Sequence, residues 1–166
     1  LLMLGDTLYR SLTNKPCALP LVEEYERYNC LIIGLYPVSL NDVSHFGIMN
    51  GVWEDKDERI LNVSTVYEKP TSSYAEEYLS VRNNKGVREY CSVFGQYILT
   101  PEVFHQLAAD IKKDDEEGTS REIELTSALE AVRSRVGMIG VRLNSERFDM
   151  GSPTALVETV AKFSKK

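Results

Sequence analysis

The sequence lacks any apolar run that approaches the ~20 residues needed to cross a bilayer. Its one apolar start, LLML, is too short for a signal peptide and has no basic flank. Three cysteines, Cys17, Cys30 and Cys91, are far apart and form no C-x-x-C pair. This spacing argues against a disulfide framework or a cysteine metal site, and it favours buried or incidental thiols in a reducing cytoplasm. We therefore expect a cytoplasmic protein with no membrane attachment.

Histidine and positive charge are also scarce. The chain has only two histidines, His45 and His105, and neither has a partnering cysteine or acidic motif, so nucleophilic catalysis is not indicated. The formal net charge is −6, which argues against a general nucleic-acid binder. A phosphate ligand remains compatible with this charge, because it needs only one or two well-placed cations.

The 166 residues, 43% of them hydrophobic, suffice for a single domain over 1–166. A continuous apolar run at 29–38 predicts a strand that is covered on both faces. The helical pattern at 19–28 precedes it, so 1–38 is interpreted as a β-α-β unit. Strand patterns at 47–55 and 59–69 flank a polar turn and predict an antiparallel hairpin.

A further strand is expected at 88–99, and Thr100-Pro101 then starts a helix that runs to about residue 113. The remaining segments complete an α/β fold with a mixed sheet. They begin with a polar, mobile excursion at 73–86 and a charged loop at 112–122. A helix follows at 125–134, with Thr126 as its N-cap, and then a strand or hairpin at 137–151. The last segment is a helix at 154–163 with Leu156, Val160 and Phe163 on one face.

The apolar start LLML predicts an interior strand, which needs a neighbour on each edge. Later strands can supply one neighbour. The other would come from sequence ahead of Leu1 or from another chain. Asp6 follows this strand at its carboxyl end, where ligands of open α/β sheets collect. From position alone, Asp6 is either a turn residue or a ligand of Mg²⁺, a cation that prefers oxygen.

Three other short motifs carry candidate chemistry. Glu68-Lys69 ends a hairpin strand, where both side chains can turn toward a site. There the carboxylate can accept hydrogen bonds from a polyol and the amine can bind a phosphate. The alternative is that the two residues form a surface ion pair. Asp149 precedes a Gly turn and a helix N-terminus. It is either a metal ligand or a negative charge that interacts favourably with the helix dipole. Gly47 and Gly95 allow close backbone approach to a ligand, although bulges explain them equally well.

The order of these motifs resembles the sugar-1-phosphate nucleotidyltransferases, in particular the uridylyltransferase branch. The motifs are LLMLGD, VSHFG, YEKP, VFGQYILTPEVF, EIELTSAL and RFDMGSP, and they extend over nearly the whole chain. The resemblance implies a Rossmann-like nucleotidyltransferase fold with a mixed sheet. The family's Gly-rich loop, which resembles G-x-G-T-R-x-x-P-x-T and grips the nucleotide, does not occur in the sequence. The chain therefore resembles the C-terminal portion of such a domain, which alone is expected to be inactive.

The resemblance also implies the roles of individual residues. Asp6 and Asp149 match the two aspartates that bind Mg²⁺, and Lys69 matches the lysine on the phosphate of the sugar. The expected sugar contacts are Gly47, Glu68, Val93 and Tyr97. Two positions depart from the family's pattern: Thr7 stands where many uridylyltransferases have an aspartate, and Ser127 replaces the aspartate of L-T-D-A.

The activity implied by the resemblance is Mg²⁺-dependent transfer of a uridylyl group from UTP to glucose 1-phosphate, which gives UDP-glucose and pyrophosphate. Another sugar 1-phosphate or another nucleotide is an alternative. So is a non-catalytic subunit that binds sugar phosphate or regulates an enzyme. Members of the family are commonly dimers or tetramers, so a homo-oligomer is expected.

Overall fold

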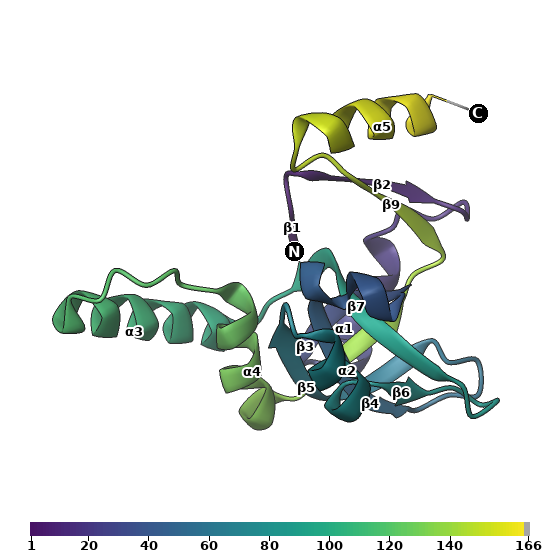
Figure 1. Cartoon of the computed structure of the whole chain (residues 1–166). Coiled ribbons are helices and arrows are strands. Elements are labelled where there is room, and N and C mark those ends of the chain that lie inside the picture. The colour runs from purple at the N-terminus through teal and green to yellow at the C-terminus, as the bar shows by residue number, and fades with distance from the viewer. Residues whose placement is uncertain (165–166) are drawn as a thin grey trace.

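The computed structural model describes residues 1–164, in which a mixed sheet is covered by helices on both faces (Figure 1). The strands are β1 (Leu2–Met3), β2 (Thr7–Ser11), β3 (Leu31–Val38), β4 (Gly47–Trp53), β5 (Ile60–Glu68), β6 (Val81–Arg82), β7 (Arg88–Ile98), β8 (Met138–Arg142) and β9 (Ser145–Asp149). The helices are α1 (Leu19–Tyr28), the 3₁₀ helix η1 (Leu40–His45), α2 (Ser72–Tyr78), α3 (Pro101–Glu117), α4 (Leu125–Val136) and α5 (Pro153–Phe163). None of these helices is long and apolar enough to span a membrane.

The main sheet has the strand order β1-β7-β3-β8-β5-β4, with β6 on β7. Strands β3 and β8 pair in parallel, and the other pairs are antiparallel, so the mixed sheet of the sequence prediction is confirmed. The predicted hairpin is also confirmed, because β4 pairs with β5 from Gly47 opposite Glu68 to Trp53 opposite Leu61.

The central strand β3 explains why its sequence is apolar throughout. Leu31, Ile33 and Leu35 pack with residues of α3 and α4 on one face of the sheet. Ile32 packs with Leu21 of α1 on the other face. A strand buried on both faces needs apolar residues at every position, as the run at 29–38 predicts.

Within the described residues, the first strand has one of the two neighbours that an interior strand needs, and a later strand supplies it, as predicted. Residues Leu2–Met3 pair with β7 on one edge only, and β7 separates β1 from β3, so 1–38 is not a simple β-α-β unit. Leu1 and Met3 are 64% and 46% exposed. Within residues 1–164, β7 is the only strand that pairs with β1, which leaves this apolar segment at an edge.

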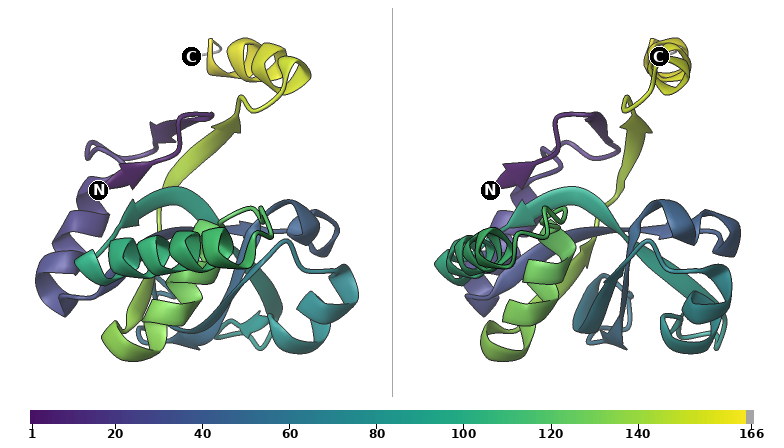
Figure 2. Two further views of the ribbon diagram at one scale, coloured as in Figure 1. Left: turned by 90° about the vertical axis from the view of Figure 1, so that its left-hand side faces the viewer. Right: turned by 60° about the vertical axis from the view of Figure 1, so that its left-hand side comes forward.

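Two strands near the C-terminus do not form a hairpin, one of the two alternatives that the sequence predicts for 137–151. Strand β8 lies in the main sheet between β3 and β5, whereas β9 pairs with β2 in a separate two-stranded sheet. Figure 2 shows this small sheet and α5 standing away from the main sheet. Helix α5 has the predicted apolar face, but Leu156, Val160 and Phe163 are all exposed.

Two polar segments are more regular than the sequence predicts. The segment at 73–86, expected to be mobile, contains α2 and β6, and Ala75 and Leu79 are buried against Val43 and Tyr90. Helix α3 continues through the predicted charged loop to Glu117. The ion pairs Lys112–Glu116 and Lys113–Glu117 support this last part, and Gly118 ends it at a positive φ of 62°.

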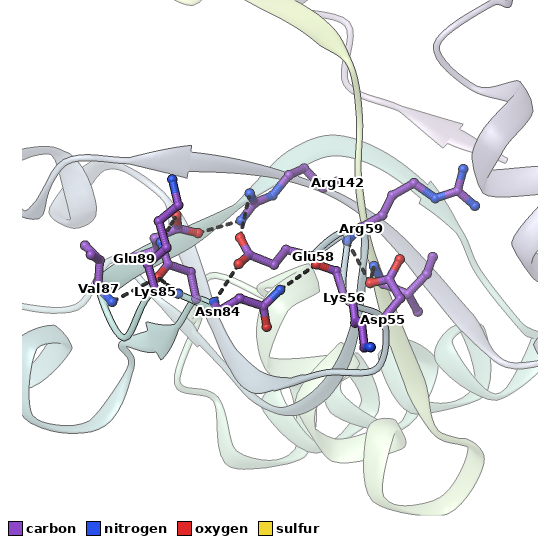
Figure 3. Close-up of polar contacts among 11 residues, drawn as sticks. Asp55, Lys56, Glu58, Arg59, Asn84, Lys85, Val87, Glu89 and Arg142 are labelled. Carbon is purple, nitrogen blue, oxygen red and sulfur yellow. Dashed lines mark hydrogen bonds and ion pairs between the residues drawn. The ribbon is translucent and has the colours of Figure 1, made fainter.

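The turn between β4 and β5 is attached to the turn after β6 by a polar network (Figure 3). Glu58 accepts a hydrogen bond of 2.6 Å from the backbone N–H of Asn84. Arg142 of β8 donates a hydrogen bond of 2.6 Å to Glu89 and lies 3.7 Å from Glu58. These contacts hold the turn of the hairpin against β7, β8 and the turn after β6.

Gly51 gives a direct test of the hairpin geometry. It lies at a register shift in β4, and a Cβ atom there would overlap the carbonyl of Asn62 on β5. Because the obstacle is backbone, Gly51→Ala is expected to lower the free energy of unfolding by about 1–3 kcal/mol. The measurement is urea denaturation, with Gly5→Ala as control, since no atom lies within 4 Å of a Cβ at Gly5. Equal stability of the two variants would contradict this prediction.

Candidate active site

A cavity of about 570 Å³ lies between the main sheet and the β2–β9 sheet. Its walls come from the turn before β2, the start of β4, the end of β5, the middle of β7, the segment before α4 and the end of β9. All seven residues predicted for the site line this cavity: Asp6, Gly47, Glu68, Lys69, Val93, Tyr97 and Asp149.

The two aspartates approach each other because β2 and β9 pair in antiparallel register. Thr7 lies opposite Asp149, and the N–H of Met150 donates a hydrogen bond of 2.7 Å to the carbonyl of Asp6. A Cβ atom at Gly151 would lie 3.2 Å from Oδ1 of Asp149 and 3.5 Å from Oδ2 of Asp6. Both carboxylates therefore lie around the same glycine, 143 positions apart in the sequence but on one wall of the cavity.

This pair fits the needs of a magnesium ion. Oδ1 of Asp149 accepts a hydrogen bond from the N–H of Gly151, and Oδ1 of Asp6 accepts one from the hydroxyl of Thr7. The Oδ2 atoms of both residues accept none from residues 1–164. The described residues contain no cluster of three acidic, histidine or cysteine side chains. Mg²⁺ in proteins is commonly held by one or two carboxylates that are completed by water and substrate phosphates, so a pair is sufficient.

Glu68 and Lys69 line the same cavity from the end of β5. The hydroxyl of Thr126 donates a hydrogen bond of 2.6 Å to Oε2 of Glu68. A Cβ at Gly47 would lie 3.1 Å from the same oxygen, so a larger residue there would crowd the carboxylate. The carboxylate of Glu68 is thus oriented on both sides and exposes its remaining edge to the cavity.

Lys69 reaches the cavity because of its backbone conformation. Its φ of 45° ends the strand, and its N–H donates to the carbonyl of Phe46 at 3.0 Å. The chain therefore turns at Lys69, and the side chains of both Glu68 and Lys69 line the cavity. The Lys69 side chain is 63% exposed, and its Nζ is 3.6 Å from Oε1 of Glu68. A flexible, solvated amine of this kind is suited to binding an anionic group.

The floor of the cavity is an irregular part of β7. Gly95 has a φ of 89°, and the pairing of β7 with β3 shifts register at this point. The carbonyl of Gly95 accepts hydrogen bonds from the hydroxyl of Tyr9 and the N–H of Leu4, at 2.9 and 3.0 Å. Tyr97 is only 4% exposed, and burial, with a smaller effect of Glu68, raises its pKa, so it is a neutral phenol.

Two cavity residues were not assigned to the site from the sequence. Thr126 was predicted as the N-cap of its helix, but Glu124 occupies that position and Thr126 lies in the first turn, bonded to Glu68. Arg147 lines the cavity on the same face of β9 as Asp149, two residues along the strand. The alternation of RFD along a strand is the signal that could have placed Arg147 with Asp149.

Comparison with known proteins decides the family. The profile of the nucleotidyl transferase family matches residues 1–166. The chain belongs to the nucleotidyl transferase family.

Individual relatives agree with this family assignment. The chain is 28% identical over 164 residues to the UTP–glucose-1-phosphate uridylyltransferase of Staphylococcus haemolyticus, covering 99% of this chain and 50% of the relative. The uridylyltransferase of Streptococcus pneumoniae is 28% identical over 166 residues, with the same coverage. The chain thus spans about half the length of the curated relatives it matches.

Solved structures share the fold. An apo crystal structure of a UDP-glucose pyrophosphorylase superposes with a TM-score of 0.77 at 27% identity, over 98% of this chain and 53% of that one. A UDP-glucose pyrophosphorylase in complex with UDP-glucose gives a TM-score of 0.75 at 28% identity, over 99% and 55%. The predicted nucleotidyltransferase fold is therefore confirmed, and the similarity to uridylyltransferases agrees with the resemblance in the motifs.

Proposed function

We propose that the protein containing this chain transfers a uridylyl group from UTP to glucose 1-phosphate, which forms UDP-glucose and releases pyrophosphate. One observation carries the proposal: a single cavity is lined by the pair Asp6 and Asp149 and also by Glu68 and Lys69. The relatives named uridylyltransferase support the choice of uridylyl transfer. Because this chain spans half their length, the activity is proposed for the full-length protein.

The chemistry of the reaction suits a site without an activated base. The second pKa of a phosphate monoester is about 6, so a sugar 1-phosphate is largely dianionic at neutral pH and is already a nucleophile. It attacks the α-phosphorus of the triphosphate, and pyrophosphate leaves. The difficulty lies in bringing two polyanions into line, so positioning and neutralisation of charge contribute most to the rate.

Each wall of the cavity has a role in this scheme. Lys69 holds the phosphate of the sugar 1-phosphate and offsets part of its charge. Glu68, oriented by Thr126, accepts hydrogen bonds from hydroxyl groups of the sugar, while the backbone at Gly47 and Val93 and the ring of Tyr97 shape its pocket. Asp6 and Asp149 would hold Mg²⁺, which supplies Lewis-acid stabilisation of charge on the phosphates.

The experiment is a coupled pyrophosphate-release assay on the full-length protein. A panel of nucleoside triphosphates and sugar 1-phosphates is tested with and without Mg²⁺. We expect the highest kcat/KM for UTP with glucose 1-phosphate, and no release without the metal. Tight binding of a sugar 1-phosphate with no release for any pair would contradict the proposal and identify a non-catalytic binding subunit.

The bond from Thr126 to Glu68 leads to a separate prediction. Thr126→Val has nearly the same shape but removes the donor, and a hydrogen bond to a charged group contributes about 1.5–3 kcal/mol. We expect the KM for glucose 1-phosphate to rise by roughly tenfold or more, while the KM for UTP stays unchanged. Thr126→Ser keeps the hydroxyl and is the matched control. If Val and Ser behave alike in the KM for the sugar, Thr126 does not orient Glu68.

A further inference from the structure

Arg147 lines the cavity and is held there by packing and one hydrogen bond rather than by an ion pair. Its guanidinium lies 4.1 Å from the ring centroid of Phe46 and 5.9 Å from that of Tyr36. One nitrogen donates a hydrogen bond of 3.0 Å to the carbonyl of Val93. A guanidinium stacked on an aromatic ring in this way has its plane fixed and its edge free for further bonds.

The hydrogen bonds of Arg147 are few for its chemistry. A guanidinium has five N–H donors, and among residues 1–164 the bond to Val93 is its only hydrogen bond and no carboxylate lies within 4.0 Å. Two other partly buried arginines differ: Arg142 donates to Glu89 and Arg10 to Glu146, both at 2.6 Å.

A half-buried positive charge that lines a cavity and has no carboxylate within 4.0 Å is suited to an anionic ligand. The planar fork of a guanidinium matches the oxygens of a phosphate in a bidentate contact. Lys69 lines the same cavity from the end of β5, so two cations from different strands face one space. The neighbouring carboxylate Asp149, on the same face of β9, lies beyond ion-pair distance and does not take this role.

We propose that Arg147 binds a phosphate group of the ligand, as a second cation beside Lys69. This inference rests on the proposed function for the identity of the ligand, which is the phosphate of a sugar 1-phosphate or a phosphate of the nucleoside triphosphate. The two sources present the same chemistry to the guanidinium. Its bond to Val93 also fixes the backbone of the predicted sugar contact, so one side chain joins the phosphate position to the floor of the cavity.

The test uses the full-length protein and three variants. Arg147→Gln removes the charge but keeps an N–H donor, Arg147→Lys keeps the charge without the fork, and Arg10→Gln is the control. Arg10 lies on the other face of the β2–β9 sheet, over the rings of Phe148 and Phe163, and does not line the cavity. Thermal unfolding first establishes that each variant is folded. Calorimetric titrations then use glucose 1-phosphate, UTP and inorganic phosphate, at two concentrations of KCl.

Arg147→Gln is expected to weaken binding of at least one probe by about 10- to 100-fold, as for loss of a charge-assisted hydrogen bond. Arg147→Lys should lose less binding affinity than Arg147→Gln, and Arg10→Gln should keep the affinity of the wild type. If affinity falls for glucose 1-phosphate alone, Arg147 binds the phosphate of the sugar. If it falls for UTP alone, Arg147 binds a phosphate of the nucleotide. The salt dependence of the affected probe should also become weaker, because a cation has been removed.

Two results would overturn the proposal. One is wild-type affinity of Arg147→Gln for all three probes. The other is weaker binding with an unchanged salt dependence, which means that Arg147 only supports the backbone at Val93. The inference fails separately from the proposed function. Suppose that inorganic phosphate binds in a way that depends on Arg147, but the protein releases no pyrophosphate. This result would support the phosphate site at Arg147 and contradict the proposed transferase activity.

Discussion

Replacing Asp149 with asparagine in the full-length protein is expected to reduce pyrophosphate release by about 100- to 1,000-fold, the loss typical of removing one electrostatic contact at a reacting group. Asparagine has the shape of aspartate and retains an oxygen that accepts the hydrogen bond from the N–H of Gly151. The local turn therefore persists, and only the negative charge is lost. A single remaining carboxylate, Asp6, attracts Mg²⁺ more weakly, so the concentration of metal needed for half-maximal rate should rise.

The measurement is a titration of the initial rate with MgCl₂ at saturating UTP and glucose 1-phosphate. Asp115→Asn is the matched control, since Asp115 is an exposed aspartate of α3 and does not line the cavity. We expect the control to follow the wild-type curve. A metal titration of Asp149→Asn that coincides with the wild type would show that Asp149 does not hold the ion.

The parts of the fold that the sequence predicts well are those that depend on local signals. The hairpin of β4 and β5 follows from two strand patterns around a polar turn, and the start of α3 follows from Thr100-Pro101. The strand β3 is apolar at every position because both of its faces are covered. In each case the residues that determine the element lie within or next to it, so a single sequence contains the information.

The parts that the sequence does not predict depend on partners far along the chain. Whether β1 is an edge or an interior strand depends on which strands pair with it, and β8 and β9 are adjacent in sequence yet join different sheets. The same reason explains Thr126 and Arg147. A threonine at a helix start and an arginine in a strand have several ordinary roles, and only the fold shows that one contacts Glu68 and the other faces the cavity.

The site residues illustrate the difference between position and role. The fold brings Asp6, Glu68, Lys69 and Asp149 to the walls of one cavity. From the sequence, only the family resemblance suggests that these four residues share a site. A carboxylate pair around Gly151 and a lysine at a positive φ are properties of the fold. Their roles in binding metal and phosphate stay predictions, and kinetics of single variants will test them.

Lys69→Ala is expected to lower kcat/KM for glucose 1-phosphate by roughly 10- to 100-fold, through a higher KM for the sugar 1-phosphate and a lower kcat. The amine is predicted to hold the attacking phosphate, so its loss weakens binding of the nucleophile and its alignment with UTP. The fold should be nearly unaffected, because the Lys69 side chain is 63% exposed and its contact with Glu68 is a long 3.6 Å. Alanine also retains the Cβ, so the cost of the positive φ is similar in both proteins.

The decisive comparison is between the two substrates. If Lys69 binds the phosphate of the sugar, its removal raises the KM for glucose 1-phosphate and leaves the KM for UTP close to that of the wild type. Lys85→Ala, at an exposed lysine in the turn after β6, controls for loss of a surface charge. Unchanged kinetics of Lys69→Ala would refute the role. Equal increases in both KM values would instead indicate that the amine contacts the phosphates of both substrates.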